Sequence, residues 1–150
     1  MKKISVLCLL IVLILALPAC ALNKTAITAQ DFSDHAESSG FIVEDVTEQM
    51  EGLTVVSLVA IDSTGSYQIE FHEMETQAQA SGAFSNNSAN FSQLGGGSYV
   101  SANGKNWASY AKTAGGSYSY VAYIETTLVY VQTTVDNKQS VIDFIKAMGY

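Results

Sequence analysis

The second half of the chain carries runs of strand-forming residues that only very short turns separate. These runs, rich in β-branched and aromatic residues, cover about 98–102, 106–113, 117–125 and 128–135. The dipeptides Asn103-Gly104 and Gly115-Gly116 lie between the first three runs, and both suit two-residue hairpin turns. Parallel neighbours would need a connection of about a dozen residues or more. The sequence therefore predicts an antiparallel sheet.

A further hairpin is expected in the first half of the chain. Residues 53–61 are β-branched and nearly continuously apolar, and the turn-forming sequence Asp62–Gly65 follows them. Residues 67–72 then alternate between apolar and polar side chains, as in a strand with one buried face. A shorter strand is expected at about 41–47. The first half thus predicts three strands.

Three segments have the residue spacing of helices. Thr28 and Asp31 match a capping box that would begin a helix over 28–39. Residues 75–93 lack strand alternation and carry apolar residues at helical spacing. A closing helix is expected from residue 136 or 137 to 149, with one apolar face.

This order of elements predicts the fold class. Written out, it is α-βββ-α-βββ(β)-α, with strands that are joined by hairpins and not by crossover helices. Such an order is typical of an α+β fold. We expect a single domain over residues 28–150, in which an antiparallel sheet has its helices packed on one face.

The beginning of the chain has the layout of a bacterial export signal. Lys2 and Lys3 precede a run over 4–17 that is apolar except for one serine and that Pro18 ends. A membrane-spanning helix needs about 20 apolar residues, so this run is too short to span. We expect residues 1–19 to be a signal peptide.

The end of that segment, Leu17-Pro18-Ala19-Cys20, resembles the lipobox of bacterial lipoproteins. The resemblance implies cleavage between Ala19 and Cys20 and a diacylglyceryl group on the Cys20 thiol. Two acyl chains give stable anchoring, which would hold the protein at the extracytoplasmic face of the cell membrane. Residues 20–27 would then be a lipidated tether. The same residues also fit an A-x-A site of ordinary signal peptidase, which would release a secreted protein beginning at Leu22.

Charge excludes one class of partner. Removal of residues 1–19 leaves five lysines, no arginine and all 14 acidic residues, a formal charge of −9. Binding to DNA or RNA requires basic side chains that replace the counterions on phosphate. We therefore expect no nucleic-acid partner, and we expect the membrane contact to come from the lipid anchor and not from a basic patch.

Residues for catalysis or metal binding are few. Glu70 and His72 lie two apart on an expected strand, so their side chains share a face, and zinc accepts both residue types. A zinc site needs three or four protein ligands, and His35 is the only other histidine. The motif G-x-S-x-G is absent, and the glycines at 95–97 lack the lysine of a phosphate-binding loop. We therefore expect no enzyme, no cofactor and no metal.

Aromatic residues are the most prominent feature of the second half. Tyr118 and Tyr120 share one face of an expected strand, and Trp107 and Tyr110 lie on the strand before it. Tyrosine and tryptophan combine apolar area with a polar tip, which suits contacts with proteins and sugars. These four residues are the expected binding face. The alternative is that helices cover these tyrosines as ordinary sheet-forming residues.

Short sequences spread over nearly the whole chain carry a resemblance to a known family. They are Cys20, Tyr67–Phe71, Ala83-Phe84, Ile124–Val131 and Met148–Tyr150. In these the chain resembles a family of small uncharacterised lipoproteins from Gram-positive bacteria of the Clostridia type. The resemblance implies a lipid anchor but no particular activity.

Together these patterns predict a non-enzymatic binding module in the cell envelope, with an envelope protein or glycan as its partner. A small metal-dependent hydrolase that uses Glu70 and His72 is one alternative. An accessory subunit of an envelope complex is another.

Overall fold

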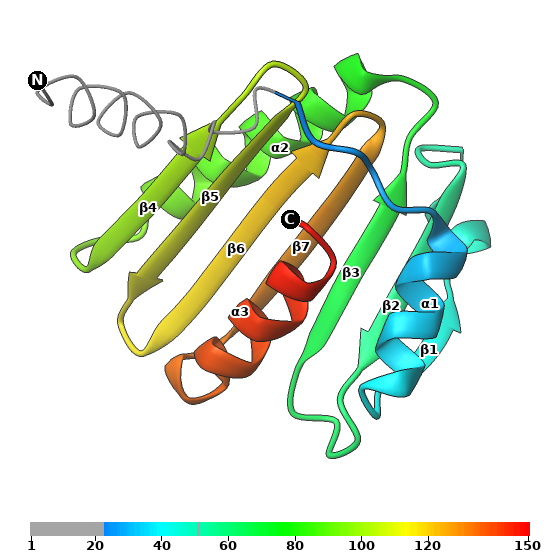
Figure 1. Cartoon of the computed structure of the whole chain (residues 1–150). Coiled ribbons are helices and arrows are strands. Elements are labelled where there is room, and N and C mark those ends of the chain that lie inside the picture. Colours follow the sequence, from blue (N-terminus) through cyan, green and yellow to red (C-terminus); the bar gives the residue numbers. More distant parts are fainter. Residues whose placement is uncertain (1–22, 51) are drawn as a thin grey trace, which may run out of the picture.

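A computed structural model describes residues 23–50 and 52–150. In this part of the chain seven strands form one antiparallel sheet, in the order β1-β2-β3-β7-β6-β5-β4 (Figure 1). The strands are β1 (Ile42–Asp45), β2 (Val56–Ile61), β3 (Gln68–Glu73), β4 (Ser98–Asn103), β5 (Trp107–Ala114), β6 (Ser117–Ile124) and β7 (Thr127–Thr134). The predicted α+β class is confirmed, and the predicted order of elements matches.

Three α-helices complete the described part: α1 (Ala29–Ser38), α2 (Gln77–Ser92) and α3 (Lys138–Ala147). Two short 3-10 helices, η2 (Thr47–Met50) and η3 (Val135–Asn137), precede β2 and α3. The predicted capping box of α1 is present, since the Thr28 hydroxyl accepts from the Asp31 amide and the Asp31 carboxylate accepts from the Thr28 amide. No helix in the described ranges is long and apolar enough to span a bilayer.

The helices lie on both faces of the sheet, so the expectation that all of them share one face is wrong. We call the face that carries α1 and α3 the front and the face that carries α2 the rear (Figure 1). The reason lies in the strands of the second half, where both faces are apolar. On β6, Tyr118 and Ala122 point to the front and Val121 points to the rear, and all three are buried. A sheet that is apolar on both faces needs cover on both.

The front core lies between α1, α3 and the strands β2, β3, β7 and β6. Phe32 of α1 stacks on Phe71 of β3 with ring centroids 5.0 Å apart, and Phe144 of α3 meets Phe32 edge to face. Val129 and Val131 of β7 are fully buried beneath these rings. This cluster holds β3 and β7 together at the middle of the sheet.

The rear core is smaller and lies under α2. It consists of Phe91 of α2 with Val121 and Leu128 of the sheet, and Phe84 and Tyr110 pack against it. Cover of the two faces is therefore uneven. None of the described helices lies on the front of β4 and β5 (Figure 1), and Val100 of β4 is 72% exposed.

Residues 23–28 run along one end of the sheet towards α1 (Figure 1). The Lys24 amide donates to the Asn106 side-chain oxygen at 2.9 Å, and the Lys24 ammonium donates to the Gly149 carbonyl at 2.8 Å. Ala26 and Ile27 pack against the front core. Of the expected tether over 20–27, residues 24–27 are thus held against the domain, because their polar and apolar groups both find partners there.

Candidate functional site

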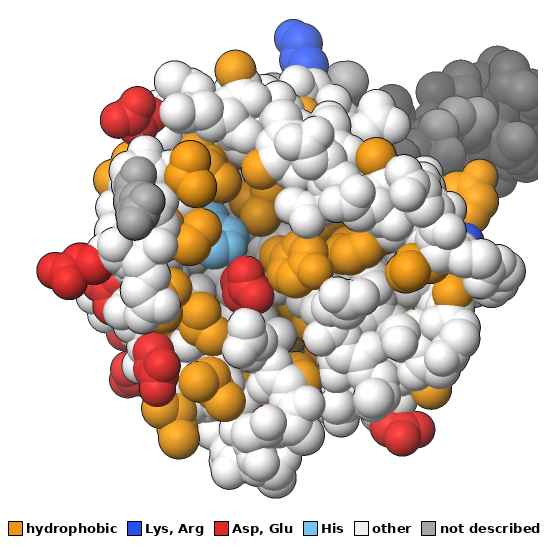
Figure 2. All heavy atoms as spheres, turned by 180° about the vertical axis from the view of Figure 1, so that it is seen from behind, with side chains coloured by type: hydrophobic (Ala, Val, Ile, Leu, Met, Phe, Trp, Pro, Cys, Tyr) orange, Lys and Arg blue, Asp and Glu red, His pale blue; other side chains and the backbone are white. Residues whose placement is uncertain are grey.

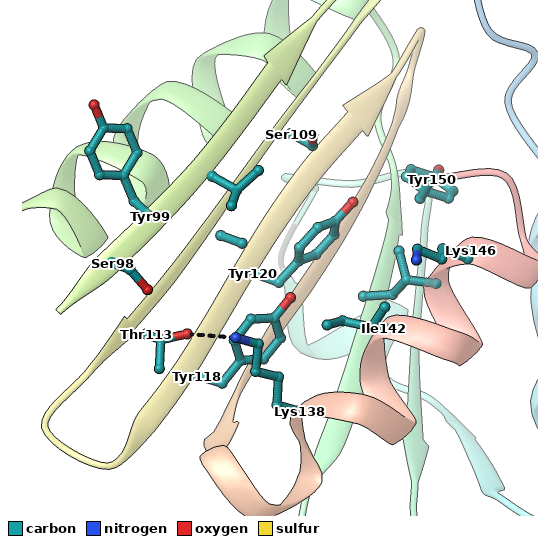
Figure 3. Close-up of a pocket in the computed structure, with 13 residues that line it drawn as sticks. Ser98, Tyr99, Ser109, Thr113, Tyr118, Tyr120, Lys138, Ile142, Lys146 and Tyr150 are labelled. Atoms are coloured by element: carbon teal, nitrogen blue, oxygen red, sulfur yellow. Dashed lines mark hydrogen bonds between the residues drawn. The ribbon is translucent and has the colours of Figure 1, made fainter.

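A groove opens on the front face where α3 stops short of covering β5 and β4. Its volume is about 370 Å³, within the range of pockets that bind small molecules. We call it the front groove; its lining residues are Ser98, Tyr99, Val100, Ser109, Ala111, Thr113, Tyr118, Tyr120, Lys138, Ile142, Ile145, Lys146 and Tyr150. Figure 3 shows the strands as its floor and α3 as its wall.

Strand alternation sets the floor of the front groove. Thr113 of β5 lies opposite Tyr118 of β6, and Ala111 lies opposite Tyr120, so these four side chains share the front face. The ring of Tyr99 points away from the groove at the outer edge of β4 (Figure 3). The small side chains of Ser109, Ala111 and Thr113 leave the space that a larger residue would fill.

The two front-face tyrosines of β6 are buried and not displayed on the surface. Tyr118 is 3% exposed and Tyr120 is 9% exposed. Burial raises the pKa of Tyr118, Tyr120 and Tyr150, so all three phenols stay neutral. The Tyr120 hydroxyl is hydrogen-bonded to Ser109, and the Tyr150 hydroxyl to Thr127. The sequence left open whether Tyr118 and Tyr120 are exposed for binding or covered by a helix. The structure shows them covered, although both rings still border the front groove.

The wall of the front groove carries two lysines. Lys138 and Lys146 are eight residues apart with Ile142 between them, so the three lie on one side of α3. The Lys138 ammonium donates to the Thr113 hydroxyl at 3.2 Å and lies 5.4 Å from the centre of the Tyr118 ring (Figure 3). This contact spans the groove from α3 to β5 at one end.

The charge of the front groove is opposite to that of the domain. Among the lining residues there are two lysines and no aspartate or glutamate. From residue 20 onwards the sequence has five lysines against 14 acidic residues. Two of its few cations therefore lie beside one groove, where apolar side chains and neutral hydroxyl groups supply the rest of the lining.

The other two residues of the expected binding face lie elsewhere. Trp107 is on the front face at the start of β5, where the Lys24 ammonium lies 4.5 Å from its ring centre. Tyr110 is on the rear face, stacked on Tyr99 with ring centroids 5.8 Å apart, and packs against the rear core. The expected face of four residues is therefore corrected, because positions 107 and 110 are an odd number of residues apart and point to opposite faces of one strand.

Glu70 and His72 share the rear face, as their spacing predicts. The His72 Nε2 atom lies 3.3 Å from the Glu70 carboxylate, and the Ser57 hydroxyl lies 2.9 Å from His72 Nδ1. Glu73 points to the other face, opposite Thr127. In the ranges that the structure describes, no group of three or more His, Cys, Asp or Glu side chains is placed to hold a metal ion.

Lys138, Lys146 and Ser57 were not among the site residues expected from the sequence. A signal was present for each, since the lysines and Ile142 have i, i+4, i+8 spacing and Ser57 is a single hydroxyl residue within an apolar strand. Ala19 and Cys20, the expected cleavage and lipidation residues, lie outside the described residues.

No protein-family model, curated protein or solved structure matches this chain.

Proposed function

We propose that this protein is a binding module of the cell envelope whose front groove takes a small molecule with an apolar body and one anionic group. The observation that carries the proposal is the lining of the front groove, where lysines meet apolar side chains in an otherwise acidic domain. A carboxylate, sulfonate or phosphate group would pair with Lys138 or Lys146. The apolar body would lie on Val100, Ala111 and Ile142.

The size of the front groove favours a small ligand over a folded partner. A specific protein interface buries about 800 Å² on each partner, whereas the groove is a hollow of about 370 Å³ between one helix and three strands. The neutral phenols of Tyr118, Tyr120 and Tyr150 add hydrogen-bonding capacity at its base. We therefore narrow the expected protein or glycan partner to a small amphiphile.

We also propose that Cys20 is lipidated and that the domain lies at the outer face of the cell membrane. Lys24 is fixed to Asn106, and Cys20 lies four positions before it in the sequence. At about 3.5 Å for each extended residue, the anchor would reach about 14 Å from Lys24. The end of the sheet that carries the β4–β5 and β6–β7 turns would then lie close to the bilayer.

The groove proposal is tested with 8-anilinonaphthalene-1-sulfonate (ANS), a fluorescent aromatic sulfonate, added to the purified protein. We expect saturable fluorescence enhancement. Ala111→Leu fills the groove and should weaken binding about tenfold, the effect of about 1.4 kcal/mol. Ser101→Leu is the matched control, since Ser101 is exposed on the rear face of β4. Equal binding by A111L and wild type would refute the site.

The role of the lysines is tested by comparing ANS with N-phenyl-1-naphthylamine, which has the same rings without the sulfonate. Wild type should prefer ANS. The double variant Lys138→Met, Lys146→Met keeps the apolar stems and should lose this preference, whereas Lys105→Met at an exposed position should keep it. A preference that survives in the double variant would remove the lysines from the proposal.

The anchor proposal is tested by cell fractionation. Cys20→Ser removes the thiol, so the protein should leave the membrane fraction or remain unprocessed. Membrane association of a processed C20S protein equal to that of wild type would contradict lipidation at Cys20, as would a mature wild-type protein whose mass shows no added lipid.

A further inference from the structure

A second hollow, on the rear face, has the opposite charge. We call it the rear cleft: β3 and β7 form its floor, α2 forms one wall, and residues 50 and 52–54 lie on the other side. Its volume is about 790 Å³. Figure 2 shows this face, with a histidine at the bottom of a hollow and a carboxylate and hydrophobic side chains around it.

A chain of hydrogen bonds ends at the floor of the rear cleft. The Thr54 and Ser57 hydroxyls are 2.7 Å apart, Ser57 lies 2.9 Å from His72 Nδ1, and His72 Nε2 lies 3.3 Å from Glu70. An ionised carboxylate only accepts hydrogen bonds. His72 Nε2–H therefore donates to the Glu70 carboxylate, and hydrogen bonds link Thr54, Ser57, His72 and Glu70 in that order.

Burial decides which member of this chain can meet a ligand. Ser57 is fully buried and His72 is 7% exposed, so the serine cannot attack a substrate although its spacing to histidine and glutamate resembles that of a catalytic triad. The Glu70 side chain keeps about a quarter of its surface exposed, at 27%. Among these hydrogen-bonded residues, Glu70 is thus the one whose side chain faces the rear cleft, and the buried Ser57 and His72 position its carboxylate.

The Glu70 carboxylate is ionised, and in the described part of the chain no lysine lines the rear cleft beside it. Hydrogen bonds from His72 and then from Gln68, which donates to the other oxygen at 3.0 Å, lower the pKa of Glu70 below its usual range. The lining residues of the rear cleft include no lysine. Within the described residues, the short contact that Glu70 makes with a basic side chain is the one with His72, at 3.3 Å.

The remaining lining favours a ligand with a carbon body. Leu128 and Tyr130 flank Glu70 on the floor, and Met50 and Met74 border the rear cleft. Asn86 and Asn87 of α2 place amide groups at its other side. Methionine adapts to ligands of different shapes, and the amides offer both donors and acceptors.

From this geometry we propose that the rear cleft is a binding site for a small organic ammonium ion, with the Glu70 carboxylate as its counter-ion. A primary ammonium group donates to the free lone pairs of the carboxylate while its carbon chain lies on Leu128 and Tyr130. The site is independent of the front groove, because the sheet separates the two. The ligand of the rear cleft is a cation, whereas the ligand of the front groove is an anion.

Calorimetric titration of the purified protein with n-hexylammonium tests the proposal, with n-hexanol as the uncharged match. We expect hexylammonium to bind and hexanol to bind about tenfold more weakly or not at all. Glu70→Gln keeps the shape of the side chain and should weaken hexylammonium binding about tenfold. Glu44→Gln is the matched control, since Glu44 is an exposed carboxylate on the same face, on β1.

A second variant tests the site without touching the hydrogen-bonded chain. Gly82 of α2 borders the rear cleft, and a Cβ added there meets no atom within 4 Å. Gly82→Leu suits a helix better than glycine does and should occupy the cleft, so hexylammonium binding should fall as in E70Q. Absence of binding to wild type, equal binding of hexanol, or unchanged binding by E70Q and G82L would each overturn the proposal.

Discussion

Gly97 lies so close to its neighbour strand that no side chain fits. A Cβ at this position would be 1.8 Å from the Thr113 carbonyl oxygen, and the φ angle of 74° is in the left-handed region that favours glycine. Thr113 borders the front groove. The start of β4 is therefore fixed against β5 by the absence of a side chain.

This contact gives a prediction with an internal control. Gly96 also has a positive φ, 70°, but a Cβ there meets nothing within 4 Å. Gly96→Ala should cost about 1 kcal/mol of unfolding free energy for its backbone conformation alone. Gly97→Ala should cost about 3 kcal/mol or more, because β4 has to move away from β5. Urea unfolding measures both, and equal losses would contradict the close approach.

At the residue scale, part of the candidate site could be predicted from the sequence. Alternation predicts that Tyr118 and Tyr120 share a face, and they do. The same rule places Trp107 and Tyr110 on opposite faces. What alternation cannot supply is which face a given helix covers, so the burial of Tyr118 under α3 follows only from the three-dimensional arrangement.

The elements were predictable because each carries its own local signal. The hairpin turn at Gly115 and Gly116 has two positive φ angles, 58° and 83°, as glycine permits. The side of the sheet on which α2 lies was not predictable. Its exposed residues are uncharged glutamine, serine, asparagine, glycine and alanine, and its buried residues are Ala80 and Phe91, so the sequence contrast between its two sides is slight.

Because α2 buries little apolar surface, its stability depends more than usual on the hydrogen bonds of its first turn. The Thr76 hydroxyl accepts from the Gln79 amide, and the Gln79 side chain accepts from the Thr76 amide. Thr76→Ala should cost about 1 kcal/mol and speed hydrogen exchange in the first turns of α2. Thr76→Ser keeps the hydroxyl and should behave as wild type. Equal stability of T76A and T76S would show that the cap does not hold the helix.

On the scale of the whole molecule, three buried phenols link stability to alkaline pH. Burial raises the pKa of Tyr118, Tyr120 and Tyr150 above the ordinary value of 10.0. The unfolded chain then loses these protons at a lower pH than the folded protein does. The stabilisation is complete below pH 10 and declines as pH rises towards the folded pKa values.

The free energy of unfolding should accordingly be level up to about pH 9 and fall steeply above about pH 10. Tyr120→Phe should reduce the slope, since one fewer buried phenol titrates, while costing about 1 kcal/mol at neutral pH for the bond to Ser109. Urea unfolding at a series of pH values measures this. A slope in Y120F equal to that of wild type would contradict the burial of this hydroxyl.

The two hollows of the molecule also differ in the charge of their linings. The front groove has lysines and no carboxylate among its lining residues, and the rear cleft has Glu70 and no lysine. Composition predicts an acidic domain but not this difference, because strand alternation directs Glu70 of β3 to the rear face while α3, with its lysines, packs on the front. The front groove remains the main site of the proposed function.

Mapping of amide chemical shifts in the ¹H–¹⁵N spectrum during titration with ANS tests that claim most directly. The account predicts that the amides which shift belong to the front groove, on β4, β5, β6 and α3, and that those of α2 stay in place. Shifts confined to α2 and the rear face, or binding without any shift around Ala111 and Lys138, would contradict it.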